Sequence, residues 1–400
     1  MPGWSRARHR ATGPPDKSLA AANARLLDTF PRTGALTPPG RSLTWNRGPS
    51  SRCRFADGGM RGLFQVKIGR AGGRGGGAMA LGTAALLAIL LSVQAGCVKR
   101  PQEPLRIGVN AWPPFELLYL AREKGFFEDE KVEVDLVDFS SYTGILRSYH
   151  QGNVDAFFAT LNEVQIADNF QDQPVVTLVV DYSFGGDALV VRDGISDLKA
   201  LRGRRIAYEE SALGSYELER ILTIGGLEPD DVVAVSRLPE EAEQDFHRGT
   251  VDGVITYEPG LGRLLRGEGA RVLFSSRDIP GEIVDVMAVR RSVLDRRAGE
   301  LRGVLRAWFR AVAYMKEQPQ EAAAGMARRH NLTVEEFLQG LQGAHVPDLR
   351  ENRELLGSTR APGRLHQTAG RLAEFLVRHG LTRKVVSGPD IIRPELIESL

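Results

Sequence analysis

The hydrophobic pattern of this chain becomes regular at residue 105 and from there alternates between two periods. Runs with apolar residues at every second position predict β-strands, and runs with apolar residues three or four positions apart predict helices. The first of these elements are expected as strands at 105–110, 132–139 and 154–159, with helices at 115–127 and 143–150 between them. This alternation predicts a parallel sheet with helices on both faces.

A second block of the same kind follows, and a helical tail comes after it. The strands expected in this block lie at 175–180, 188–191, 205–208, 232–235, 251–256, 271–274 and 284–289. The helices expected between them lie at 215–225, 240–248 and 259–265. From residue 292 onward the pattern is helical, with breaks at Pro319, Pro347, Pro362 and Pro389. The sequence therefore predicts two α/β units followed by helices.

Charge is divided unevenly along the chain. Residues 1–97 hold 14 Lys and Arg against 3 Asp and Glu, a balance of +11, and the whole 400-residue chain carries +2, which leaves −9 for residues 98–400. A basic surface of the kind that binds nucleic acid is thus confined to the leader, and we find no nucleic-acid motif. We expect no nucleic-acid partner.

The leader itself reads as a targeting segment. An apolar run at 78–93 follows several basic residues and ends in small ones, as in a secretory signal peptide. We interpret residues 60–97 as that signal peptide and residues 1–59 as a non-native or disordered extension, with translation starting near Met60. Residues 98–104 are expected to form a short polar tether.

Cys97 ends the signal-like segment. The preceding Gln94-Ala95-Gly96 is similar to the lipobox of bacterial lipoproteins, in which the cysteine is acylated, although Gln94 stands where a leucine is usual. Ordinary signal-peptidase cleavage and a retained membrane anchor are the alternatives. Each of the three places residues 98–400 outside the cytoplasmic membrane, in the periplasm or at the cell surface, and the first anchors them to a membrane by lipid.

The folded part lacks the residues of several kinds of chemistry. Cys53 and Cys97 are the two cysteines of the chain, so residues 98–400 contain no thiol, which excludes a cysteine nucleophile, a disulfide framework and a CxxC metal site there. Histidines between His247 and His379 are scattered without ligand spacing. We predict no metal and no cofactor.

The predicted strand ends define a ligand crevice, because ligands of doubly wound sheets bind beyond the carboxyl ends of the strands. Aromatic and acidic residues dominate these segments, and Arg and Lys are absent from them. The segments are 110–112, 140–142, 160–162, 181–187, 209–215 and 257–258. Nitrate or bicarbonate would favour cationic contacts, so this lining favours an amine-bearing or heteroaromatic solute, aminosulfonate-like or pyrimidine-like.

Several motifs carry a family resemblance. The stretch from Val109 to Phe127, VNAWPPFELLYLAREKGFF, resembles the opening of ABC transporter substrate-binding proteins of the nitrate/sulfonate/taurine type, the NMT1/SsuA-like family. Further motifs in the family's order are Gly152-Asn-Val-Asp-Ala156, Asp181-Tyr-Ser-Phe-Gly-Gly-Asp-Ala188, residues 198–207 and Thr256-Tyr-Glu-Pro259. The resemblance covers residues 104 to 390.

The resemblance implies a fold, a division of the chain and a function. The fold is the type II periplasmic-binding-protein fold, two α/β lobes, each a doubly wound sheet, joined by a two-stranded hinge. Lobe one would comprise residues 104–183 plus 285–400, lobe two residues 188–282, and the hinge would pass through 181–187 and 281–285. The implied function is that of a monomeric protein, not an enzyme, that binds a small solute and delivers it to an ABC permease.

Candidate ligand-binding residues follow from the crevice and the resemblance together. Trp112, held by two prolines at a strand end, can stack on a planar or cationic ligand, and Tyr142 and Tyr257 can do the same; core packing is the alternative for each. Asp187 can receive an amine or form an Asx turn. Other candidates are Asn110, Ser141, Thr160, Asn162 and Glu258.

The start of the helix near residue 211 is a further candidate. Ser211 or Ser215 can cap this helix, and the exposed backbone amides around Gly214 can hold a carboxylate, sulfonate or phosphate without an arginine. The alternative is an ordinary helix cap.

Two other functional classes stay open. An enzyme on the same fold, pyrimidine-synthase-like or dehydratase-like, would need a reactive pair, and no paired nucleophile and base stands out. A ligand-sensing ectodomain would need a downstream module, and none follows Leu400 in this sequence.

Overall fold

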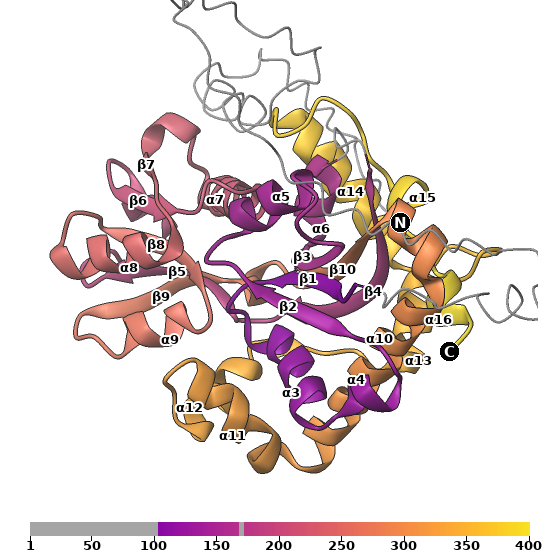
Figure 1. The fold of residues 1–400 in the computed structure, drawn as a ribbon. Helices are drawn as coiled ribbons and strands as arrows, with labels where there is room; N and C mark the ends of the chain where they lie inside the picture. The colour runs from indigo at the N-terminus through magenta and orange to yellow at the C-terminus, as the bar shows by residue number, and fades with distance from the viewer. Residues whose placement is uncertain (1–102, 168–171) are drawn as a thin grey trace, which may run out of the picture. The chain divides into compact units, whose positions relative to one another are not determined.

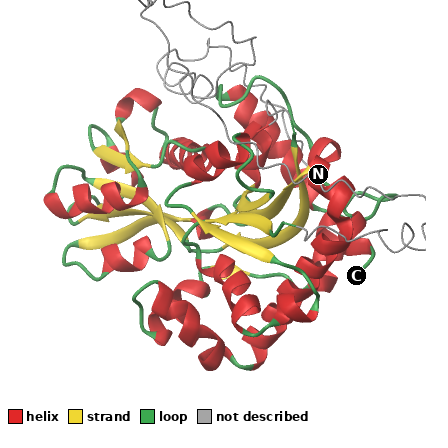
Figure 2. Ribbon diagram, in the orientation of Figure 1, coloured by secondary structure: helices red, strands yellow, loops and turns green. Residues whose placement is uncertain are grey.

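The computed structural model describes residues 103–167 and 172–400, and the predictions for the leader, the signal peptide and Cys97 lie outside these residues. Two sheets organise the described part, with helices packed around both (Figures 1 and 2). We call the six-stranded sheet and its helices lobe one, and the five-stranded sheet and its helices lobe two.

The sheet of lobe one has the strand order β11-β4-β10-β3-β1-β2. Its strands are β1 (Leu105–Val109), β2 (Val134–Asp138), β3 (Ala156–Thr160), β4 (Pro174–Ser183), β10 (Val284–Arg290) and β11 (Ala344–His345). The central strands β3, β4 and β10 are buried almost throughout, which explains their continuous apolar runs. Helices between the early strands are η1 (Pro113–Glu116), α3 (Leu117–Glu123), α4 (Phe126–Asp129), α5 (Tyr142–His150) and α6 (Leu161–Ile166).

The sheet of lobe two has the order β7-β6-β8-β5-β9 and comes from one continuous stretch of chain. Its strands are β5 (Asp187–Arg192), β6 (Arg205–Tyr208), β7 (Val233–Ser236), β8 (Gly253–Tyr257) and β9 (Ala270–Ser275). Its helices are η3 (Leu198–Leu201), α7 (Ala212–Gly225), η4 (Pro229–Asp231), α8 (Pro239–Arg248) and α9 (Gly260–Leu265), and η5 (Ser276–Asp278) follows β9.

The C-terminal part is helical, as expected. It begins with α10 (Arg291–Glu317), whose buried face includes Trp308 and packs on lobe one. The remaining helices are α11 (Pro319–Arg329), α12 (Val334–Leu341), α13 (Leu349–Leu356), α14 (Leu365–Arg378), α15 (Gly388–Ile391) and α16 (Glu395–Glu398). Among the described residues, no helix has the length and apolar character needed to cross a membrane.

All ten strands expected from the sequence are present, but the expectation of parallel sheets is only partly right. β1 pairs in parallel with β2 and β3, and β6 with β7 and β8. β10 runs antiparallel to β3 and β4, and β5 runs antiparallel to β8 and β9. These two strands are the first element of the chain after each passage between the lobes, so no crossover helix sets their direction.

A close backbone contact braces the first passage between the lobes. The N–H groups of Phe184 and Gly186 donate to the carbonyl oxygen of Gly343, at 2.7 and 2.9 Å, next to the pairing of β11 with β4. A Cβ on Gly186 would lie 2.4 Å from the Trp112 ring and 2.8 Å from that carbonyl, so only glycine fits there. The sequence pattern did not predict β11, since two residues show no periodicity.

Candidate functional site

A cavity lies between the lobes and gathers side chains from both. Its volume is about 10 Å³, room for about one water molecule, so a solute can enter only if the lobes separate. It is lined by Tyr142, Glu209, Ser211, Leu213, Gly214, Glu217, Pro239, Ile255, Thr256 and Tyr257. Four of the residues proposed from the sequence therefore meet there: Tyr142, Ser211, Gly214 and Tyr257.

A row of polar side chains crosses the middle of the lobe-one sheet at its hinge end. Asp285 on β10 lies directly opposite Thr160 on β3 and Asp181 on β4. Asp181 accepts a 3.0 Å hydrogen bond from Nε1 of Trp112, whose side chain is only 2% exposed. Two carboxyl groups directly opposite each other repel when both are ionised, so this row favours a shared proton or an outside cation.

Trp112, Tyr142 and Tyr257 lie where this row of polar side chains meets lobe two. Asp187 is paired across the strands with Tyr257, and the hydroxyl of Tyr257 accepts a 3.2 Å hydrogen bond from Nδ2 of Asn110. The ring centroid of Tyr257 lies 6.2 Å from that of Trp112 and 6.0 Å from that of Tyr142. These rings form one aromatic wall against the aspartates.

Two helix N-termini face each other across the cleft, and each is capped twice. Ser141 begins α5 by accepting from the N–H of Gly144, and Ser211 begins α7 by accepting from the N–H of Gly214, both at 3.1 Å. Both serines are thus helix caps, which was the alternative stated for Ser211.

The second cap of each helix comes from the opposite lobe. Glu209 of lobe two accepts from the N–H of Thr143 in α5 at 3.2 Å, and Glu163 of lobe one accepts from the N–H of Leu213 in α7 at 3.0 Å. The two glutamates therefore form a reciprocal pair of interlobe contacts, each at the positive end of a helix dipole.

Burial dominates the electrostatics of the cleft. It raises the pKa of Glu209 to about 8 and that of Glu163 to about 7, although the helix amides that donate to both act in the opposite direction. It also raises the pKa of Asp181, Asp187, Asp285 and Glu217 well above the usual carboxyl range, and neighbouring carboxylates add to the shift of Asp187, Asp285 and Glu217. Burial thus favours the protonated forms of these groups in the folded protein.

The remaining candidates lie around the cavity rather than on its wall. Thr160 and Asn162 are fully buried where β3 ends and α6 begins, and Ser215 is 5% exposed within α7. Glu258 accepts a 3.1 Å hydrogen bond from the N–H of Gly262 at the start of α9, a local structural contact.

Sequence reasoning missed half of the acidic residues of the cleft. Asp181, Asp187 and Glu209 belong to the predicted crevice segments, with Glu209 a weaker candidate because acidic loop residues are mostly solvated, whereas Asp285 belongs only to the predicted hinge and Glu163 and Glu217 to no predicted site. A signal existed for the aspartates, because each interrupts an otherwise apolar strand. The glutamates lie in helices and loops where only the tertiary contacts reveal their burial.

A family model described as NMT1/THI5 like matches residues 112–322, just over half of the chain. The chain belongs to the NMT1/THI5-like family. A protein of Bacillus subtilis (strain 168) named for binding aliphatic sulfonates is 28% identical over 231 residues, which is 55% of this chain and 67% of the relative. The 4-amino-5-hydroxymethyl-2-methylpyrimidine phosphate synthase of Candida albicans (strain WO-1) is 28% identical over 138 residues, 34% of this chain and 40% of the enzyme.

Solved structures establish the fold of this NMT1/THI5-like chain. The alkanesulfonate-binding protein SsuA of Xanthomonas axonopodis pv. citri, bound to MOPS, aligns with a TM-score of 0.63 at 17% identity, over 73% of this chain and 99% of that protein. The predicted two-lobe periplasmic-binding-protein fold is thereby confirmed.

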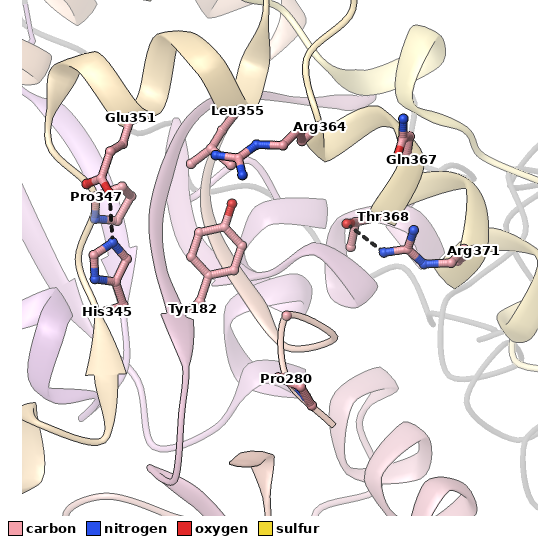
Figure 3. Close-up of a pocket in the computed structure, with 11 residues that line it drawn as sticks. Tyr182, Pro280, His345, Pro347, Glu351, Leu355, Arg364, Gln367, Thr368 and Arg371 are labelled. Carbon is pink, nitrogen blue, oxygen red and sulfur yellow. Dashed lines mark hydrogen bonds and ion pairs between the residues drawn. The ribbon is translucent and has the colours of Figure 1, made fainter. Parts of the chain in front are cut away.

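A second cavity of this NMT1/THI5-like protein lies at the hinge and differs in character. Its volume is about 480 Å³, and it shares no lining residue with the cleft. Figure 3 shows Tyr182 in its centre, with Arg364 above the ring and the paired His345 and Glu351 to one side. Arg364 and Arg371 make this cavity basic, whereas the cleft is acidic.

Proposed function

We propose that this protein is the solute-binding component of an ABC import system, which captures a small organic solute between its lobes and delivers it to a permease. The observation that supports this most is the convergence of both lobes on one buried polar site. Glu163 and Glu209 join the lobes directly across this site, so the contacts made there determine whether the lobes are closed.

A permease can use such closure as its signal. A solute held by side chains of both lobes stabilises the closed form, and the permease would dock productively on that form. We further propose that the protein acts as a monomer, with lobe boundaries at 104–183 plus 285–400 and at 188–282.

A thermal-shift screen tests this function. Because a ligand that binds only the folded state stabilises it, a solute at 100 times its Kd should add about 2.7 kcal/mol and raise the Tm by about 5 °C. The panel would contain sulfonates, taurine, nitrate, pyrimidines, flavins and amines. A saturable hit without turnover supports a binding protein, whereas silence across the panel would count against it.

An enzyme is the second candidate, because several relatives are pyrimidine phosphate synthases. Incubation of the protein with each hit, followed by mass spectrometry of the supernatant, separates the two functions. A hit recovered unchanged supports transport, and its conversion to a product would establish an enzyme. Residues 98–400 offer no cysteine for such chemistry.

We propose that Cys97 anchors the protein by lipid to the outer face of a membrane. The substitution Cys97→Ser should leave the folded part intact and move the processed protein from the membrane fraction to the soluble fraction, since no acyl chain can then be attached. Fractionation and immunoblotting measure this. A processed Cys97→Ser protein that stays with the membrane would contradict acylation.

A further inference from the structure

The unpartnered polar atoms of the cleft include carboxyl and amide acceptors, beside the amide Nδ2 of Asn162 and the hydroxyls of Thr160, Ser215 and Thr256, which can donate. Buried side-chain atoms without a hydrogen-bond partner among the described residues include one carboxyl oxygen each of Glu163, Asp181, Glu209 and Asp285 and the amide oxygen of Asn110. The side chains that carry them are at least nine-tenths buried. A ligand that satisfies such atoms must bring hydrogen-bond donors.

The cleft offers an anion no place of positive potential. No Lys or Arg lines the interlobe cavity, and within the described residues none forms an ion pair with the six buried carboxyl groups. The two helix N-termini that could hold an anion are already capped by the carboxyl groups of Glu163 and Glu209.

Closure brings negative groups together from both sides. Glu163, Asp181 and Asp285 belong to lobe one, and they meet three acidic side chains of lobe two, Asp187, Glu209 and Glu217. Charges on these neighbouring carboxyl groups repel one another, so the closed form needs either protons or a positive charge from outside.

We propose that the solute of this protein is an organic cation, a protonated amine or amidinium, bound between the hinge aspartates and the aromatic wall. This rests on the proposed function and narrows it to a substrate class. Asp181 and Asp285 accept its N–H groups, and the rings of Tyr142 and Tyr257 contact its charged or flat part. In the part of the chain that the structure describes, no group of three or more acidic or histidine side chains has the arrangement of a metal site.

Binding of the cation is linked to proton release. Asp181 and Asp285 face each other, and the other titratable groups that face them are Asp187 and Tyr142; Trp112 donates to Asp181. In the free protein these carboxyl groups share protons; when the cation arrives, its charge replaces them and the protons pass to the solvent. An anion would show the opposite linkage and take protons up.

Matched solutes test the proposal on the full-length protein. The probes are benzylamine, benzyl alcohol and benzoate, then 1,3-diaminopropane and propanesulfonate, followed by a wider set of amines and amidines each paired with a neutral or anionic analogue. Calorimetric titration at pH 7 in two buffers of different ionisation enthalpy gives the affinity and the protons exchanged. We expect the hits to be cations that release on the order of one proton each.

Variants locate the bound charge. Asp285→Asn should weaken the cation hit about 30-fold or more, because a buried charged partner is lost, while the exposed Asp135→Asn in β2 should leave it unchanged. If Asp285→Asn does not fold, the proton release of the unaltered protein still decides. An anion that binds with proton uptake, or that binds more tightly to Asp285→Asn, would overturn the cation class but leave the solute-binding function. If no probe of any pair binds, the result counts against both the cation class and the solute-binding function.

Discussion

Between pH 5 and pH 8 the free energy of unfolding of this protein should fall as the pH rises. Burial raises the pKa of Glu163 to about 7 and that of Glu209 to about 8 in the folded state, whereas both groups ionise near pH 4.3 once unfolded. The unfolded chain therefore binds fewer protons than the native state over this range, and stability declines. Each such group lowers the free energy of unfolding by about 1.4 kcal/mol per pH unit, so the two together lower it by about 3 kcal/mol per pH unit between pH 5 and pH 7.

Other titrating groups modify this slope without reversing it. Asp181, Asp187, Asp285 and Glu217 act in the same direction as the glutamates. The histidines whose pKa is lowered by burial, His366 and His379, act in the opposite direction, but only below about pH 6.5.

Urea unfolding at pH 5, 6, 7 and 8 measures the effect. Glu209→Gln should flatten the profile, because the neutral amide imposes no cost when the pH rises, and Asp135→Asn should reproduce the unaltered profile. A free energy of unfolding that stays level or increases from pH 5 to pH 8 would refute the assignment of protons to the cleft.

Trp112→Phe should destabilise the protein by about 1–3 kcal/mol at pH 8, and less at pH 5. The phenyl ring keeps most of the packing but removes the Nε1 donor, which leaves Asp181 as a buried acceptor without its partner. That hydrogen bond favours the ionised form of Asp181 and lowers its pKa, so its loss matters more as the pH rises. Trp112→Ala adds a cavity and should cost about 3–5 kcal/mol.

Trp308 provides a matched control for this substitution. It is fully buried against Phe158, and its Nε1 has no hydrogen-bond partner among the described residues. Trp308→Phe removes the same atoms without breaking a hydrogen bond, so its cost should not depend on pH. Equal pH profiles for Trp112→Phe and Trp308→Phe would show that the Trp112–Asp181 contact contributes nothing specific.

The fold could be predicted from sequence because hydrophobic periodicity is a local property. The strands at 105–110 and 205–208 were located to within a residue, and so was the helix at 143–150, which is followed by Gly152 with a φ of +80° that favours glycine. Strand direction could not be predicted in the same way. A continuous apolar run such as that of β10 predicts a buried strand but does not show whether it pairs in parallel or antiparallel with its neighbours.

The candidate site was predictable in type but not in detail. Trp112, Tyr142 and Tyr257 follow strand ends, where topology alone places ligand-facing residues. The exchange of glutamates between the helix N-termini depends on how the lobes meet, and contacts between residues 50 and 66 positions apart leave no sign in the sequence. Thus neither the helix α6 nor a role for Glu163 in it was predicted, although its Oε1 accepts from the N–H of Leu213 in the opposite lobe.

The placement of β10 in the middle of the lobe-one sheet also orders the events of synthesis. β4 pairs with β10 and β11 and not with β3. It therefore cannot join β3, β1 and β2 in one sheet until β10, which ends at residue 290, has emerged from the ribosome. The sheet of lobe two needs nothing beyond residue 275. The second-made lobe can therefore finish folding first, and a chain interrupted between residues 275 and 284 carries a complete lobe two beside open strand edges that invite aggregation.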